Sequence, residues 1–211
     1  VPSIIKKVEG ILGATLSGEV RLSPSLMRFD GFARYDRGTH VIWFGVDHPD
    51  ADEDYLSALL AHELSHVYRD HQPRVWGFLG KPLKDVSRRE YLSALSAHEH
   101  LASEGMATLF SQAMFPNIPL HVHHFYSPEE MRWCVENFET IDRSITKGLK
   151  TDQEVWKYYG EDAVARGSPS RTQYYWAARK ISEWALKGQP EDMTKTVSLL
   201  GLPGLEFECF Q

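Results

Sequence analysis

The chain has 211 residues, of which 42% are hydrophobic and 25% charged, so it can form a substantial core without disulfides or other staples. Its net charge of −6 argues against nucleic acid as the main partner. Its two cysteines, Cys134 and Cys209, lie far apart and form no CxxC pair, so neither a disulfide framework nor a thiolate zinc site is indicated. The first residues contain lysines and no long apolar run, and we therefore expect a cytoplasmic protein with no membrane partner.

The first part of the chain predicts a mixture of helix and strand. Residues 3–14 are expected to form a short helix, and residues 18–22 a short strand. Residues 28–35 and 39–46 are rich in aromatic and β-branched side chains and flank the sequence Asp-Arg-Gly at 36–38. That arrangement predicts a β-hairpin.

The second part of the chain predicts mostly helix. Pro and Gly residues between 72 and 84 indicate a loop, after which residues 86–115 return to a helical pattern. Two prolines and the sequence HVHHFY then interrupt the pattern, and four further helices are expected at about residues 128–147, 151–165, 169–187 and 191–200. We therefore predict an α+β fold in a single domain over residues 1–211, with an N-terminal α/β lobe at about 1–75 and a helical lobe at about 76–211.

The sequence HELSH, at residues 62–66, lies in a segment from about residue 52 to 70 that predicts an amphipathic helix. Apolar residues recur there at spacings of three and four, and acidic residues crowd its start, where the helix dipole favours negative charge. Positions i and i+4 share a helix face, so His62 and His66 can bind one metal ion while Glu63 lies beside it. In this HExxH signature the histidines are zinc ligands and the glutamate is a general base. The motif therefore predicts one catalytic zinc ion.

A catalytic zinc site normally has three protein ligands, so a third must come from elsewhere. The best candidate is Glu104, in HLASEGMATLFS on a second predicted helix. Gly105 removes a side chain beside this ligand, which permits close helix packing or close approach to the metal. Thr108, one turn later, is expected to hydrogen-bond a ligating histidine. His100 is the alternative ligand, although an exposed, histidine-rich helix face that includes His98 also explains it.

The motifs HELSH and SEGMAT together resemble the gluzincin metallopeptidases, in which a later helix supplies a glutamate ligand. More narrowly, the chain resembles a bacterial family described as predicted zinc-dependent proteases, from AHELSHVYR through SEGMATLF to PSRTQYYWAARKISEWAL. The third block of that family usually has two Gly-Tyr pairs one turn apart. Here Gln173 and Ala177 replace the glycines, and Ala178 replaces the second tyrosine. The resemblance implies a zincin-like fold, with a small twisted antiparallel or mixed sheet and an active-site helix before the helical lobe.

The resemblance also implies an oxyanion donor and a surface that binds substrate. Tyr174, the tyrosine retained in register, is expected to donate to the oxyanion that develops on the scissile carbonyl, although the bulky side chains around it also fit a core stripe. Arg171 is a further candidate for stabilising that negative charge. An edge strand that precedes the active-site helix is expected to bind an extended peptide. If residues 39–46 are the strand that leads directly into the helix, the candidate edge consists of Gly31, Phe32, Ala33, Arg34 and Tyr35.

We therefore expect a zinc-dependent metallopeptidase that acts on a peptide or protein substrate. One alternative is a non-enzymatic zinc-binding module that binds a protein or peptide partner. Glu63 argues against it, because a structural zinc site needs no base. Another is a helical interaction protein in which the motif is accidental. His121, His123 and His124 lie near prolines and are expected on a surface loop, with an accessory metal or a substrate contact as alternatives. The choice between endo- and exopeptidase action stays open, as does the oligomeric state.

Overall fold

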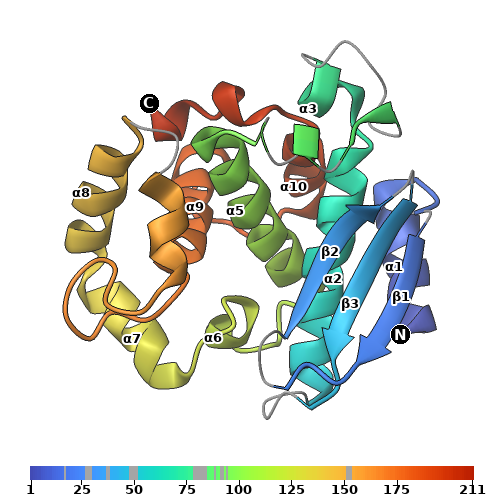
Figure 1. Ribbon diagram of the computed structural model, residues 1–211, viewed down its shortest axis with the longest axis horizontal. Coiled ribbons are helices and arrows are strands. Elements are labelled where there is room, and N and C mark those ends of the chain that lie inside the picture. The colour runs from blue at the N-terminus through green and yellow to red at the C-terminus, as the bar shows by residue number, and fades with distance from the viewer. Residues whose placement is uncertain are drawn as a thin grey trace.

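The computed structural model has an α+β fold and describes residues 1–16, 18–26, 30–36, 39–47, 52–77, 85–87, 89–90, 93, 95–150 and 154–211. A small sheet lies on one side of the molecule, with α1 (Pro2–Leu12) and α2 (Glu53–Asp70) behind it, and the remaining helices lie beyond α2 (Figure 1). Among the described residues, most of the buried apolar side chains form a continuous cluster that extends from Val8 to Phe210. None of the described helices is long and apolar enough to cross a membrane.

The sheet is mixed and has the strand order β1-β3-β2, so β2 (Gly31–Asp36) lies at one edge. β1 (Gly18–Ser23) pairs parallel with β3 (Thr39–Gly45), whereas β2 pairs antiparallel with it. The predicted strands and the antiparallel pairing of β2 with β3 are confirmed, although β2 begins at Gly31 and not at residue 28; residues 28–29 and 37–38 lie outside the described part of the chain. Ile42 and Phe44 alternate along β3 and point into the core, because successive side chains of a strand face opposite sides of the sheet.

The helix that carries HELSH is confirmed. Asp52 caps α2 by accepting a hydrogen bond from the Tyr55 N–H at 2.8 Å, and Glu53 and Asp54 lie in the first turn, where they complement the helix dipole. The helix is buried along most of its length, since the sheet packs on one side and α5 (Ala97–Met114) on another. This burial places the motif inside the molecule.

The helical half of the chain differs from the prediction in where its helices begin and end. The described elements are α3 (Pro73–Trp76), α5, α6 (Leu120–His123), α7 (Pro128–Glu136), α8 (Phe138–Gly148), the 3-10 helix η3 (Glu154–Tyr159), α9 (Thr172–Ile181), the π-helical turn η4 (Ser182–Leu186), α10 (Met193–Leu200), η5 (Gly204–Glu206) and η6 (Glu208–Phe210). The expected loop over 72–84 therefore contains one short helix in its described part, and its residues 78–84 lie outside the description.

Three predicted helices are shorter or divided. The segment 86–115 does not form one helix, because Ser96 caps the start of α5 with its side chain; residues 88, 91, 92 and 94 lie outside the described part of the chain. The helix expected over 128–147 is two helices that meet at Asn137. The helix expected over 151–165 is wrong for its described residues, 154–165: they contain only the 3-10 helix η3, and Asp162, with a φ of 58°, cannot continue a right-handed helix.

A buried ion pair and a glycine hold α5 against its neighbours. The Arg69 guanidinium donates to the Glu99 carboxylate at 2.7 and 2.9 Å, and the Gly204 N–H donates to the other oxygen of Glu99 at 2.6 Å. On the opposite side, a Cβ on Gly105 would lie 2.9 Å from both the backbone carbon and the Cβ of Ala177. Gly105 therefore permits the close packing of α5 on α9, one of the two roles predicted for it.

Candidate metal centre

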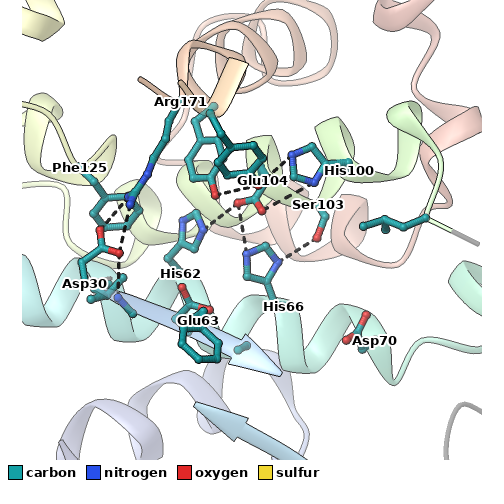
Figure 2. Close-up of a pocket in the computed structure, with 17 residues that line it drawn as sticks. Asp30, His62, Glu63, His66, Asp70, His100, Ser103, Glu104, Phe125 and Arg171 are labelled. Carbon is teal, nitrogen blue, oxygen red and sulfur yellow. Dashed lines mark hydrogen bonds and ion pairs between the residues drawn. The ribbon is translucent and has the colours of Figure 1, made fainter. Parts of the chain in front are cut away.

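Two helices bring the predicted ligands together. His62 and His66 lie one turn apart on α2, and Glu104 approaches them from α5. Oε2 of Glu104 is 3.2 Å from Nε2 of His62 and 3.5 Å from Nε2 of His66. Figure 2 shows the two imidazoles and the carboxylate pointing toward one another. These three side chains form the single group in the described part of the chain whose ligand atoms, within 4.8 Å of one another, could hold a metal ion.

The spacing of these atoms fits a zinc ion. A tetrahedral zinc with bonds of about 2.0–2.1 Å requires ligand atoms about 3.3–3.4 Å apart. The measured separations of 3.2 and 3.5 Å bracket that value. Two imidazoles and one carboxylate are also a donor set found at catalytic zinc sites, where a fourth position remains for water. The residues therefore fit the metal that the motif predicts.

The ionised carboxylate of Glu104 supplies the negative charge of the cluster. Burial alone would raise the pKa of Glu104, but His66 and the hydrogen bonds from both histidines hold it well below its usual range. Burial lowers the pKa of His62. For His66 burial also acts to lower the pKa, but the Glu104 carboxylate raises it to about 9. The cluster thus holds an ionised carboxylate between two imidazoles.

Glu63 is a buried carboxyl group beside the cluster. It is 5% exposed, and Figure 2 shows it next to both histidines, whereas its carboxylate is not part of the ligand group. Burial raises its pKa to about 7, although the charge of His66 and the main chain of Ala33 act to lower it. The Glu63 side chain therefore lies where its proton affinity is high.

Hydrogen bonds to the far sides of the ligands differ from those expected. The Ser103 hydroxyl lies 2.9 Å from Nδ1 of His66 and orients that ring. Thr108, which was expected in this role, instead donates to the main-chain carbonyl of Glu104 at 3.0 Å, so that prediction is wrong. A threonine in a helix can satisfy its hydroxyl on the preceding turn, and Thr108 is completely buried away from the histidines. Within the described residues, Nδ1 of His62 is buried without a hydrogen-bond partner.

A cavity of about 310 Å³ opens in front of the cluster, and the edge strand forms part of its wall. Gly31, Phe32 and Ala33 line it, as do Glu63 and all three ligands. Arg34 and Tyr35, also predicted to bind substrate, are not among the described residues of its lining. Tyr35 packs its ring against His40 instead, with centroids 5.0 Å apart.

Alternate residues of β2 point their main-chain N–H and C=O groups away from β3, toward the open edge of the sheet. The Gly45 N–H donates to the Asp30 carbonyl at 2.8 Å, and bonded and non-bonded pairs alternate along an antiparallel ladder. Gly31 and Ala33 therefore turn their main-chain groups to the open edge. The Gly31 N–H donates to the Asp30 carboxylate at 2.8 Å. Because the N–H and C=O of one strand residue point the same way, both carbonyls face the open edge.

Tyr174, the expected oxyanion donor, lines the cavity. Its ring stacks against His62 with centroids 5.8 Å apart, and the side chain is 8% exposed. Arg171 also lines the cavity, but it forms an ion pair with Asp30 at 2.7 Å. Asp30 is buried and also accepts from the Tyr55 hydroxyl at 2.8 Å.

Several histidines lie inside the molecule, contrary to the surface positions expected for them. His100 is 3% exposed, and its Nδ1 lies 4.0 Å from Oε1 of Glu104. His123 and His124 are buried as well, and Nδ1 of His123 lies 3.0 Å from the Ser111 hydroxyl. Burial lowers the pKa of His123 to about 4 and that of His124 to about 3, so both rings are neutral packing groups.

Tyr159 was missed by the sequence analysis. It lies at the end of η3, lines the cavity and places its hydroxyl 3.4 Å from that of Tyr174. No motif marks it, because the segment around it was predicted to be an ordinary helix. Asp30 and Phe125, two further residues of the cavity wall, were missed for the same lack of a local signal.

Comparisons of this chain with protein-family models, with curated proteins and with solved structures gave no match.

Proposed function

We propose that this protein is a zinc-dependent metallopeptidase of the gluzincin type, with a single zincin-like domain related to the predicted zinc-dependent proteases. The observation that carries the proposal is the convergence of His62, His66 and Glu104 beside the buried carboxyl group of Glu63. An accidental HExxH sequence would not require a carboxylate 42 residues further on to lie 3.2 Å from its first histidine. The partner we expect is a peptide or protein substrate, and a cytoplasmic location remains a prediction.

In this proposal His62, His66 and Glu104 hold one zinc ion, which when bound polarises a carbonyl and lowers the pKa of its water to about 7. Glu63 takes the proton of the attacking water and delivers it to the leaving amine. Glu63 is buried and lies in the wall of the cavity beside all three ligands. Tyr174 donates to the negative charge that develops on the carbonyl oxygen.

The edge of β2 binds the substrate main chain. Gly31 and Ala33 turn their carbonyl oxygens to the open edge, where these oxygens accept from the N–H groups of an extended peptide. Phe32, which is 37% exposed and lies between these two residues, pairs its own main chain with β3 and takes no part in the pairing with the peptide. The binding is thus to backbone groups that every peptide possesses.

The decisive experiment compares the wild type with Glu63→Gln after loading each with one equivalent of zinc. On a broad peptide library the variant is expected to retain its zinc and to lose about 10²–10⁴-fold in rate, the contribution of a positioned acid–base group. Glu53→Gln, at the exposed start of the same helix, is the matched control and is expected to cleave at the wild-type rate.

Each negative result has a distinct meaning. If the wild type binds zinc but cleaves no peptide, the proposed enzymatic activity is refuted and the non-enzymatic zinc-binding module is favoured. If it binds no zinc, both of these functions are refuted, and the helical interaction protein remains.

A further inference from the structure

A chain of hydrogen bonds extends behind Tyr174. Its hydroxyl lies 3.4 Å from the hydroxyl of Tyr159, which in turn lies 3.1 Å from Nε2 of His100. Nδ1 of His100 faces Oε1 of Glu104 at 4.0 Å, an interaction drawn as a dashed line in Figure 2. Three separate elements, α5, η3 and α9, thus contribute one side chain each. The chain connects Tyr174 with the back of the third ligand.

Ring packing holds the middle of this chain in place. The ring of Tyr159 stacks on Trp156 with centroids 5.9 Å apart and meets the Tyr174 ring edge-on at 6.0 Å. The Trp156 ring also packs on His100 at 4.6 Å. Because these rings support one another, the Tyr159 hydroxyl has little freedom to leave its two partners.

We propose that Tyr159 is a positioning residue that holds the Tyr174 hydroxyl at the cavity, and that His100 anchors Tyr159. This inference depends on the proposed function, in which Tyr174 stabilises the oxyanion. The packing of α9 on α5 at Gly105 fixes the backbone of Tyr174, but the hydroxyl lies at the far end of a side chain with two rotatable bonds. A partner at that end is what fixes the oxygen, and a displacement of about 1 Å can cost about 10²-fold in rate.

The kinetic test uses Tyr159→Phe, Tyr174→Phe and the double variant, each with one zinc bound. We expect Tyr174→Phe to lower kcat by about 10²–10³-fold, as for loss of one oxyanion donor. Tyr159→Phe should lower kcat by about 10–10²-fold with KM unchanged. If Tyr159 acts through Tyr174, the double variant should be no slower than Tyr174→Phe.

The control is Tyr158→Phe, which removes a neighbouring hydroxyl that contacts Ser144 at 2.8 Å and does not line the cavity. It is expected to retain wild-type kcat. Multiplied losses in the double variant would overturn the inference and make Tyr159 an independent group. A wild-type rate for Tyr159→Phe would also overturn it.

A structural readout separates this inference from the proposed function. In crystal structures of the zinc-loaded wild type and of Tyr159→Phe, the Tyr174 hydroxyl should occupy the same position in every wild-type copy and a displaced or multiple position in the variant. An unmoved Tyr174 hydroxyl in the variant would refute the positioning role, whether or not the protein cleaves peptides. Absence of cleavage with the expected displacement would instead refute only the proposed function.

Discussion

Gly105→Ala tests how the two helices that carry Glu104 and Tyr174 are held together. A Cβ at this position would lie 2.9 Å from the backbone carbon and the Cβ of Ala177 and from Cδ1 of Ile181. Carbon atoms pack at about 3.5–4.0 Å, so α9 would have to move by about 0.6–1.1 Å. Overpacking of this kind costs about 1–3 kcal/mol, whereas replacing a helical glycine by alanine gains about 1 kcal/mol. We therefore expect a net loss of stability of up to about 2 kcal/mol.

Gly10→Ala supplies the matched control for this prediction. Gly10 also lies within a helix, α1, but a Cβ there would meet nothing within 4 Å. This variant should show only the gain in helix propensity, about 1 kcal/mol. Urea unfolding followed by circular dichroism measures both free energies. If Gly105→Ala proved as stable as Gly10→Ala, the close approach of α5 and α9 would be refuted.

The movement of α9 also has a consequence for activity. Zinc should bind Gly105→Ala as it binds the wild type, because none of the three ligands lies on α9. The turnover of a peptide should fall, because Tyr174 moves with α9. Zinc stoichiometry and kcat, measured on the same sample, distinguish this result from general loss of structure.

Three other predictions concern stability. Arg69→Met leaves the Glu99 carboxyl group buried without its partner and should lower the free energy of unfolding in urea by about 3–5 kcal/mol. The double variant with Glu99→Gln should recover part of this loss. Equal losses in the single and the double variant would contradict an ion pair. For Asp30, burial acts to raise the pKa, but Arg171 and the hydrogen bonds outweigh it and lower the pKa from 3.8 to about 2. A carboxyl group whose pKa is lower in the folded than in the unfolded chain stabilises the fold at pH values above its unfolded pKa. The free energy of unfolding should therefore fall by about 2 kcal/mol as the pH falls from about 4 to about 2, and Asp30→Asn should lack this loss in acid unfolding curves. Finally, zinc at a thousandfold excess over its Kd should add about 4 kcal/mol to the free energy of unfolding, an increase that a chelator reverses and that His62→Ala abolishes; a melting temperature indifferent to zinc would argue against a folded-state site.

The parts of the structure that were predicted correctly depend on local rules. His62 and His66 could be placed on one face because the i, i+4 relation is fixed once the helix forms. The start of α7 agrees with the helix expected from about residue 128, because the capping box of Ser127 and Glu130 needs only residues three positions apart. The hairpin of β2 and β3 depends likewise on one short turn between two runs of strand-forming residues.

The failures share a dependence on distant packing. Neither the parallel partner of β3 nor the division of the helix at Asn137 has a signal within a few residues. Thr108 was given a histidine partner on sequence spacing alone, whereas its direction depends on how α5 is rotated against α2. Tyr159 comes to the cavity because its segment forms only the short 3-10 helix η3, which ends at this residue.

The role of α5 was the hardest to predict in full, because this central helix contacts many different neighbours. Buried on nearly all sides, it contacts a different partner at almost every position of one stretch. Glu99 pairs with Arg69's guanidinium, His100 contacts the Tyr159 hydroxyl, Ser103 orients a ligand, Glu104 is itself a ligand, and Gly105 receives α9. Successive helical residues are rotated by about 100°, so such a stretch serves several neighbours at once and shows no single apolar face. A helix of this kind gives weak periodicity for the same reason that it organises the site.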